Sequence, residues 1–242
     1  MMNKIPEISR ARGYYVYTAN GKRYLDMALE GGRLIMGHRQ KGYALAMKNA
    51  IDKGILSCYP SPYAGRLKKA VKELLGKECF VYLLRSEERA REILKQVQDD
   101  ASVQTLLLPV PAAFAPGVVV SGSELSLEDE SVSPVILAGA VRAVYNLIAF
   151  KKEADYSGWE KGGKADSCKS LTEACGDRWE VELPYIFPLF EPDKYEAVWN
   201  AFFEAGIMLS PDYDKPSVLP PYDELAEGMR KKVLKITGRM LK

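Results

Sequence analysis

The chain has few of the residues from which nucleophilic and metal sites are built. It contains a single histidine, His38, and four cysteines among its 242 residues. The cysteines lie at positions 58, 79, 168 and 175, a spacing that matches no zinc-binding pattern. A serine or cysteine nucleophile would depend on His38, which stands in a glycine-rich turn with no partner nearby in the sequence. We therefore expect free thiols and no metal site.

The sequence also lacks an excess of one charge and a long apolar segment. Its 34 basic residues nearly balance its 32 acidic residues, leaving a net charge of +2. So small a charge, without a dense basic stripe, argues against a nucleic-acid partner. No uninterrupted apolar run approaches the roughly 18 residues of a membrane span, and residues 1–6 show no signal peptide. We expect a cytoplasmic protein without a membrane partner.

Short apolar segments do alternate with amphipathic helices, a pattern typical of an α/β protein. A hairpin is predicted over residues 14–26, with its turn at Asn20-Gly21. The clearest helix has apolar residues three and four positions apart and ends at Gly76. These apolar residues are Leu67, Ala70, Val71, Leu74 and Leu75. Strands are expected at residues 79–84, 105–108 and 118–120, and helices at 62–76, 86–98, 134–150, 193–205 and 222–240.

Several segments, taken in order, resemble the class III pyridoxal-phosphate-dependent aminotransferases and the glutamate-1-semialdehyde aminomutases. Residues 13–26, GYYVYTANGKRYLD, are similar to that family's opening pattern G-x-x-x-x-D-x-D-G-x-R-Y-x-D. Gly37-His38, followed by an alanine-rich helix, is similar to its G-H-x-x-P continuation. Residues 137–143 and 206–211 resemble an alanine-rich helix and a G-V-x-x-x-P strand near the family's other end. The resemblance implies the fold type I architecture of these enzymes.

The same resemblance indicates what the chain lacks. In the family, a central segment supplies the lysine that binds pyridoxal phosphate as a Schiff base. Here the chain is shortened between about residues 100 and 134, and no lysine lies between Lys95 and Lys151. Lys151 and Lys152 are the nearest substitutes, but they lead into a charged stretch that is typical of solvated lysines. We therefore expect no catalytic residue.

The phosphate-binding turn of the family is altered as well. Its pattern S-G-S/T-E-A joins a strand to a helix whose backbone N–H groups hold the phosphate. The corresponding residues 84–90 read LRSEERA, with no glycine and with two carboxylates where an anion would bind. Arg85 and Ser86 are the candidates for cofactor contact there. The family's Asp-Glu pair is also missing, since Glu128 and Asp129 lie in a polar connection. No bound cofactor is expected, and pyridoxal phosphate is implied by the resemblance alone.

The fold expected from these features is α/β. It combines a remnant of the fold type I large domain, about three or four strands with flanking helices, with a small α+β domain. Residues 1–60 and 178–242 are assigned to the small domain, residues 61–150 to the reduced large-domain core, and the Lys-, Gly- and Ser-rich residues 151–177 to a linker. Because so few strands leave open edges, and because subunits pair in the family, we expect a homodimer.

These features favour an aminotransferase-like pseudoenzyme with a binding or scaffolding role, as a homodimer or as the partner of a full-length aminotransferase-like protein. One alternative is a minimal pyridoxal-phosphate-dependent aminotransferase or aminomutase. A second is a protein that binds a small anionic ligand in a crevice lined by Gly32, Arg33, Gly37 and His38. The simpler interpretation of Arg33 is an ordinary surface residue, and that of His38 is a hydrogen bond that fixes the loop.

Overall fold

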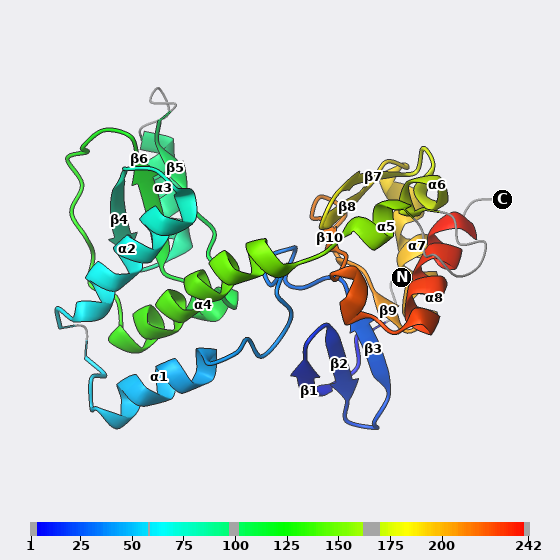
Figure 1. Cartoon of the computed structure of the whole chain (residues 1–242), viewed down its shortest axis with the longest axis horizontal. Helices are drawn as coiled ribbons and strands as arrows, with labels where there is room; N and C mark the ends of the chain where they lie inside the picture. The colour runs from blue at the N-terminus through cyan, green and yellow to red at the C-terminus, as the bar shows by residue number, and fades with distance from the viewer. Residues whose placement is uncertain (1–3, 58, 97–101, 162–169, 240–242) are drawn as a thin grey trace. The chain divides into compact units, whose positions relative to one another are not determined.

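The structure is a computed structural model that describes residues 4–57, 59–96, 102–161 and 170–239 (Figure 1). The chain divides into two compact units, which are described separately. The terminal unit contains residues 1–38 and 153–242, and the central unit contains residues 39–152. These boundaries differ from those expected, since residues 39–60 fall in the central unit and the expected linker falls largely in the terminal unit.

The central unit is built around a three-stranded antiparallel sheet in the order β4-β6-β5. All five residues of β6 are buried because helices cover both faces of the sheet. Val118 and Val120 pack in a cluster with residues of α2 and α4, whereas Val119 packs on the opposite face with Ala90 and Ile93 of α3. The elements are α1 (Tyr43–Asp52), α2 (Pro62–Leu75), β4 (Phe80–Leu84), α3 (Glu87–Gln96), β5 (Gln104–Thr105), η1 (Ala112–Phe114), β6 (Gly117–Ser121) and α4 (Pro134–Glu153).

The helices of this unit follow the sequence pattern closely. As expected, α2 buries Leu67, Ala70 and Val71 and ends at Gly76, whose φ of 63° suits a glycine. Helix α4 is buried chiefly along its first half. By length and composition, α4 is the one helix of the described residues that could cross a bilayer, a test that buried core helices also pass. An added Cβ on Gly139 would lie 2.9 Å from Met47, so this glycine lets α1 approach α4 closely.

The terminal unit joins both ends of the chain through a parallel strand pair. Leu25 of β3 pairs with Ile207 of β9 in a four-stranded sheet of order β1-β2-β3-β9. A second, antiparallel sheet has the order β10-β8-β7. The elements are β1 (Ile8–Arg12), β2 (Tyr15–Thr18), β3 (Arg23–Asp26), α5 (Ser157–Lys161), α6 (Leu171–Cys175), β7 (Trp179–Glu182), β8 (Tyr185–Pro188), α7 (Pro192–Glu204), β9 (Ile207–Met208), β10 (Ser217–Val218), η2 (Tyr222–Glu224) and α8 (Glu227–Arg239).

Part of the expected linker belongs to the core of the terminal unit. Trp159, Leu171 and Cys175 are each 1 % exposed and lie in its main apolar cluster. The indole N–H of Trp159 donates a hydrogen bond to the Pro220 carbonyl over 2.9 Å. The assignment of residues 151–177 to a linker is therefore corrected for 153–161 and 170–177, while residues 162–169 lie outside the described part of the chain.

Candidate functional site

The sequence resemblance places the family's phosphate-binding turn between β4 and α3. Ser86 caps α3, since its hydroxyl oxygen accepts a hydrogen bond from the Arg89 N–H over 3.3 Å. The turn also packs tightly against the start of β6. A Cβ placed on Gly117 would lie 2.1 Å from the carbonyl oxygen of Ser86, so no larger residue fits there without backbone movement. The sequence correctly predicts the strand, the capped helix and the junction between them.

The carboxylate of Glu130 occupies this turn. Its Oε2 accepts a hydrogen bond from the backbone N–H of Arg85 over 3.1 Å, and its Oε1 accepts one from Nε of Arg89 over 2.9 Å. The Nε of Arg85 lies 3.4 Å from Oε2. Partial burial alone would raise the pKa of Glu130, but the bonds from Arg89 and Arg85 outweigh it and lower the pKa below its usual value. The ionised carboxylate of Glu130 is therefore bound between the end of β4 and the side chain of Arg89 on α3.

The residues that carry this carboxylate run along the outer edge of β4. The Leu83 N–H donates to Oδ1 of Asp129 over 3.0 Å, and the Glu130 N–H donates to the Leu83 carbonyl over 2.8 Å. Oδ2 of Asp129 lies 2.6 Å from Nζ of Lys68 on α2. Both polar backbone groups of Leu83 are thereby satisfied, and the β4 edge is closed by the chain itself. The polar connection expected around Asp129 is present, and its role is to cover this edge.

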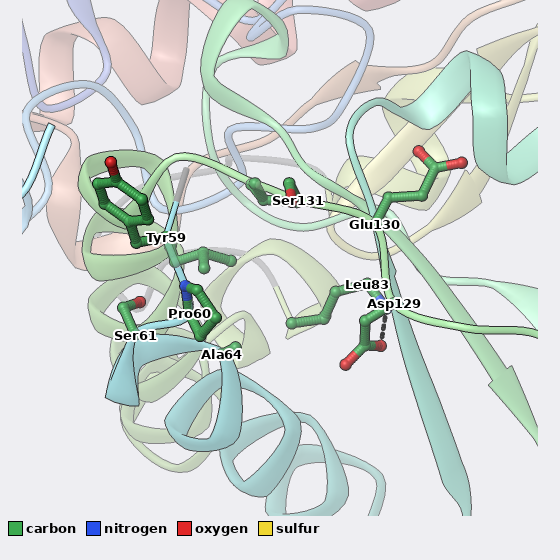
Figure 2. A pocket seen from close by; sticks show the side chains of 10 residues that line it. Tyr59, Pro60, Ser61, Ala64, Leu83, Asp129, Glu130 and Ser131 are labelled. Atoms are coloured by element: carbon green, nitrogen blue, oxygen red, sulfur yellow. Dashed lines mark hydrogen bonds between the residues drawn. The ribbon is translucent and has the colours of Figure 1, made fainter. Parts of the chain in front are cut away.

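A pocket of about 210 Å³ lies beside this segment, at the start of α2 (Figure 2). That volume falls below the roughly 300–1,000 Å³ of typical small-molecule sites. Figure 2 shows Asp129 bonded to Leu83 and Glu130 turned away from Ser61. Both carboxylates already have cationic partners, so neither offers free charge to a ligand. The Ser61 hydroxyl oxygen is buried here without a hydrogen-bond partner in the structure, which leaves one weak polar anchor.

Among the lysines whose side chains the structure describes, none is buried. Lys151 and Lys152 are exposed at the end of α4, as the sequence predicts. Lys68 and Lys72 are half-buried, but each pairs with a carboxylate, at 2.6 Å to Asp129 and 3.2 Å to Glu78. An amine that forms a Schiff base must be held against its carbonyl partner in a sheltered site. The described lysines do not meet that requirement.

The second group of candidates, in the terminal unit, forms a packed loop. A Cβ on Gly32 would lie 3.0 Å from the Tyr185 ring, and one on Gly37 would lie 2.6 Å from the Gly13 carbonyl oxygen. These glycines therefore allow close packing of the chain on itself. Arg33 is half-buried and interacts within the chain. One closely packed loop of the terminal unit contains Gly32, Arg33 and Gly37. The central unit contains Arg85 and Ser86.

His38 fixes that loop, in agreement with the simpler interpretation. Its Nε2 lies 2.8 Å from Oδ2 of Asp26, whose other oxygen accepts hydrogen bonds from the N–H groups of Ala28 and Leu29. The backbone of His38 also exchanges two hydrogen bonds with Gly13. The sequence missed Asp26 as the partner because the two residues meet only through the loop's fold. Among the described residues, no group of three potential ligands is placed to hold a metal ion.

No protein-family model matches the chain. Comparison with known sequences finds uncharacterized proteins that are similar over most of the chain and aminomutases that are similar over a short segment. An uncharacterized protein from Borreliella burgdorferi is 26% identical over 246 residues, covering 91% of this chain and 86% of that protein. One from Treponema pallidum is 22% identical, covering 94% and 93%. Glutamate-1-semialdehyde 2,1-aminomutase from Thermus thermophilus is 36% identical over 67 residues, which are 28% of this chain and 16% of the aminomutase.

Solved structures resemble nearly the whole chain. Ornithine δ-aminotransferase from Plasmodium falciparum matches with a TM-score of 0.72 at 14% identity, covering 98% of this chain and 94% of that one. The chain has the aminotransferase fold. Acetylornithine aminotransferase from Elizabethkingia anophelis matches with a TM-score of 0.66 at 15% identity, covering 98% and 94%. The resemblance to class III aminotransferases and the α/β class are thereby confirmed at the level of the fold.

The residues at the turn do not fit the pyridoxal phosphate of such enzymes. The ionised carboxylate of Glu130 is already bound at this turn, and Glu87 in the first turn of α3 is buried with Oε2 3.7 Å from a guanidinium nitrogen of Arg91. A phosphate at this turn would have to displace one carboxylate and approach another, and both changes cost electrostatic free energy. Sequence reasoning found Arg85 and Ser86 but missed Glu130, for which no local motif gives a signal.

Proposed function

We propose that the chain is a non-catalytic, aminotransferase-like protein with a binding or scaffolding role in the cytoplasm. It would act as a homodimer or as the partner of a complete aminotransferase-like protein. The observation that carries this proposal is the Glu130 carboxylate at the β4–α3 turn, bound by the backbone of Arg85 and by the side chain of Arg89. The turn retains the shape of an anion site, but its ligand is part of the chain.

The missing lysine supports the same proposal independently. A pyridoxal-phosphate enzyme needs an amine beside the cofactor for the resting linkage and for proton transfer. The sequence has no lysine between Lys95 and Lys151, and the lysines whose side chains the structure describes are exposed or paired with carboxylates. A fold alone does not determine activity, because chemistry depends on the residues placed in the site. The inherited fold is therefore available for binding.

An absorbance titration of the purified protein with pyridoxal phosphate tests the proposal. We expect a colourless protein whose added cofactor keeps the spectrum of the free aldehyde. A complete aminotransferase treated in parallel serves as the positive control for Schiff-base formation. A yellow protein whose colour disappears when one lysine is replaced would instead establish the alternative, a minimal aminotransferase or aminomutase.

The oligomeric state is tested separately by light scattering on the purified chain. A mass twice that of the 27.0 kDa chain is expected for the homodimer. A stable monomer that also fails to bind a complete aminotransferase-like protein would contradict the proposed assembly, while leaving the absence of catalysis unaffected.

A further inference from the structure

One face of the N-terminal sheet collects arginine and tyrosine side chains. Arg10 pairs with Tyr17 and Arg12 with Tyr15 across β1 and β2, while Tyr17 pairs with Arg23 across β2 and β3. Residues directly opposite each other in antiparallel strands share a face, as do residues two apart in one strand. These five residues therefore lie on one face of the sheet, here called the Arg–Tyr face.

The part of this face formed by β1, β2 and Arg23 is directed to solvent, whereas Leu25, which lies opposite Tyr15 on the same face, is buried. Arg10, Arg12 and Arg23 are exposed, and the two tyrosines are half-buried. Val16 and Tyr24, on the opposite face, are each 4 % exposed and belong to the core of the terminal unit. Figure 1 shows β1 as the outer strand of this sheet. The alternation therefore places three cations on the accessible side of a rigid sheet.

Two of the three arginines, Arg10 and Arg23, lie over tyrosine rings. The guanidinium of Arg10 lies 4.1 Å from the centroid of the Tyr17 ring, and that of Arg23 lies 4.7 Å from the Tyr15 ring. A guanidinium stacked on a ring keeps its N–H groups free at its edge, where they can bind a carboxylate with two parallel hydrogen bonds. Because the rings restrict the side chains before a partner arrives, less conformational entropy is lost on binding.

These three arginines have no acidic partner within the described part of the chain. Asp26, the acidic residue of these strands, is buried and bound to His38 on its Oδ2. An uncompensated cluster of three cations is complementary to a surface that carries carboxylates at matching spacing. Base stacking is disfavoured, because one face of each tyrosine ring already contacts a guanidinium group.

The spacing favours a partner in extended conformation. Arg10 and Arg12 lie on one face of an edge strand, two residues or about 6.6 Å apart. A strand added beside β1 would place carboxylates on that face if they also recurred at every second residue. We infer that the Arg–Tyr face is a docking surface for an extended acidic segment of a partner protein, with Glu or Asp at alternate positions.

This inference rests on the proposed binding role, since it names the class of partner. It does not depend on the proposed absence of Schiff-base chemistry. The pyridoxal phosphate titration and the peptide assay below can each fail without affecting the other. A protein that forms a Schiff base could still use the Arg–Tyr face, and a non-catalytic protein could lack it.

The test measures binding of the full chain to a fluorescein-labelled peptide of alternating Glu and Val, by anisotropy at low salt. The variant R10Q/R12Q/R23Q removes the three cations, while K48Q/K69Q/K77Q removes three exposed cations of the central unit and serves as the matched control. We expect the arginine variant to bind the peptide at least about ten-fold more weakly than the parent, and the lysine control to bind it as the parent does. Added salt should weaken the binding. Unchanged circular dichroism and thermal midpoint show that both variants are folded.

Several outcomes would overturn the inference. Equal binding by the arginine variant and by the lysine control would show that only net charge matters. Tighter binding of a single-stranded oligonucleotide than of the peptide, lost in the arginine variant, would assign the face to nucleic acid. Loss of self-association in that variant, without any peptide binding by the parent, would assign the face to a second copy of this chain.

Discussion

Replacing Glu130 with alanine tests whether its carboxylate holds the β4–α3 turn. The substitution removes the acceptor for the Arg85 backbone N–H and for Nε of Arg89. Hydrogen bonds to charged groups contribute about 1.5–3 kcal/mol when sheltered, but this side chain is 25% exposed and water screens part of the interaction. We therefore expect a loss of about 1 kcal/mol in the free energy of unfolding, close to a five-fold change in the folded-to-unfolded ratio.

The matched control is Glu128→Ala, two residues earlier in the same connection. Glu128 is exposed and has no side-chain partner among the described residues, so its replacement is expected to leave stability unchanged within about 0.5 kcal/mol. Urea unfolding gives the free energies, and hydrogen exchange of the peptide containing Leu83 and Arg85 reports the local effect. In the Glu130→Ala protein, these two amides are expected to exchange faster than in the control.

The effect of Glu130 also has a defined pH dependence. Because the folded state lowers the pKa of this carboxyl, its contribution is fully present above the unfolded value of about 4.5 and is lost as pH falls through the folded value. The stability difference between Glu130→Ala and the parent should therefore persist at pH 7 and shrink below about pH 4. Equal stability of the two alanine variants, or a difference independent of pH, would refute the proposed role.

Three further experiments, two with substitutions and one with an alkylating reagent, test the packing of the chain. Gly117→Ala should lower the free energy of unfolding, measured in urea, by about 1–3 kcal/mol, because the added Cβ would meet the Ser86 carbonyl. In the control Gly65→Ala, the added Cβ has nothing within 4 Å, and the free energy of unfolding should rise by about 0.5–1 kcal/mol. Equal effects of the two substitutions would contradict the close contact at Gly117. Asp26→Ala should lower the free energy of unfolding by about 1–3 kcal/mol and increase hydrogen exchange in residues 28–38, because it leaves three donors unpaired. Unchanged exchange would show that the loop does not depend on this carboxylate. Burial raises the pKa of Cys175 to about 12, so an alkylating reagent at pH 8 should label it in urea but not in the native protein, as peptide mass spectrometry would show.

The sequence predicts those features whose signals are local. The apolar spacing from Leu67 and the stop at Gly76 are enough to define α2. The Asn20-Gly21 turn defines the hairpin, and Ser86 marks the start of α3. In each case the determining residues lie within a few positions of one another, so local stereochemistry and burial decide the outcome.

The sequence does not reveal features that depend on contacts between distant residues or on interrupted patterns. Strand β8 follows Pro184 and ends at Pro188, and these prolines hide its alternation. Helices α5 and α6 were assigned to a linker because the composition around them is polar, although Trp159 is buried. The bond from Arg85 to Glu130 joins residues 45 positions apart, and its geometry depends on the path of the whole connection. No motif of either residue alone indicates that pairing.

We propose that this aminotransferase fold carries out no Schiff-base chemistry, because none of the lysines whose side chains the structure describes is sheltered. Intact-mass and peptide mass spectrometry, after equimolar pyridoxal phosphate and borohydride reduction, test it most directly. We predict at most sparse labelling spread over exposed lysines such as Lys151 and Lys152. Stoichiometric labelling of one lysine, abolished when that residue is replaced, would contradict the account.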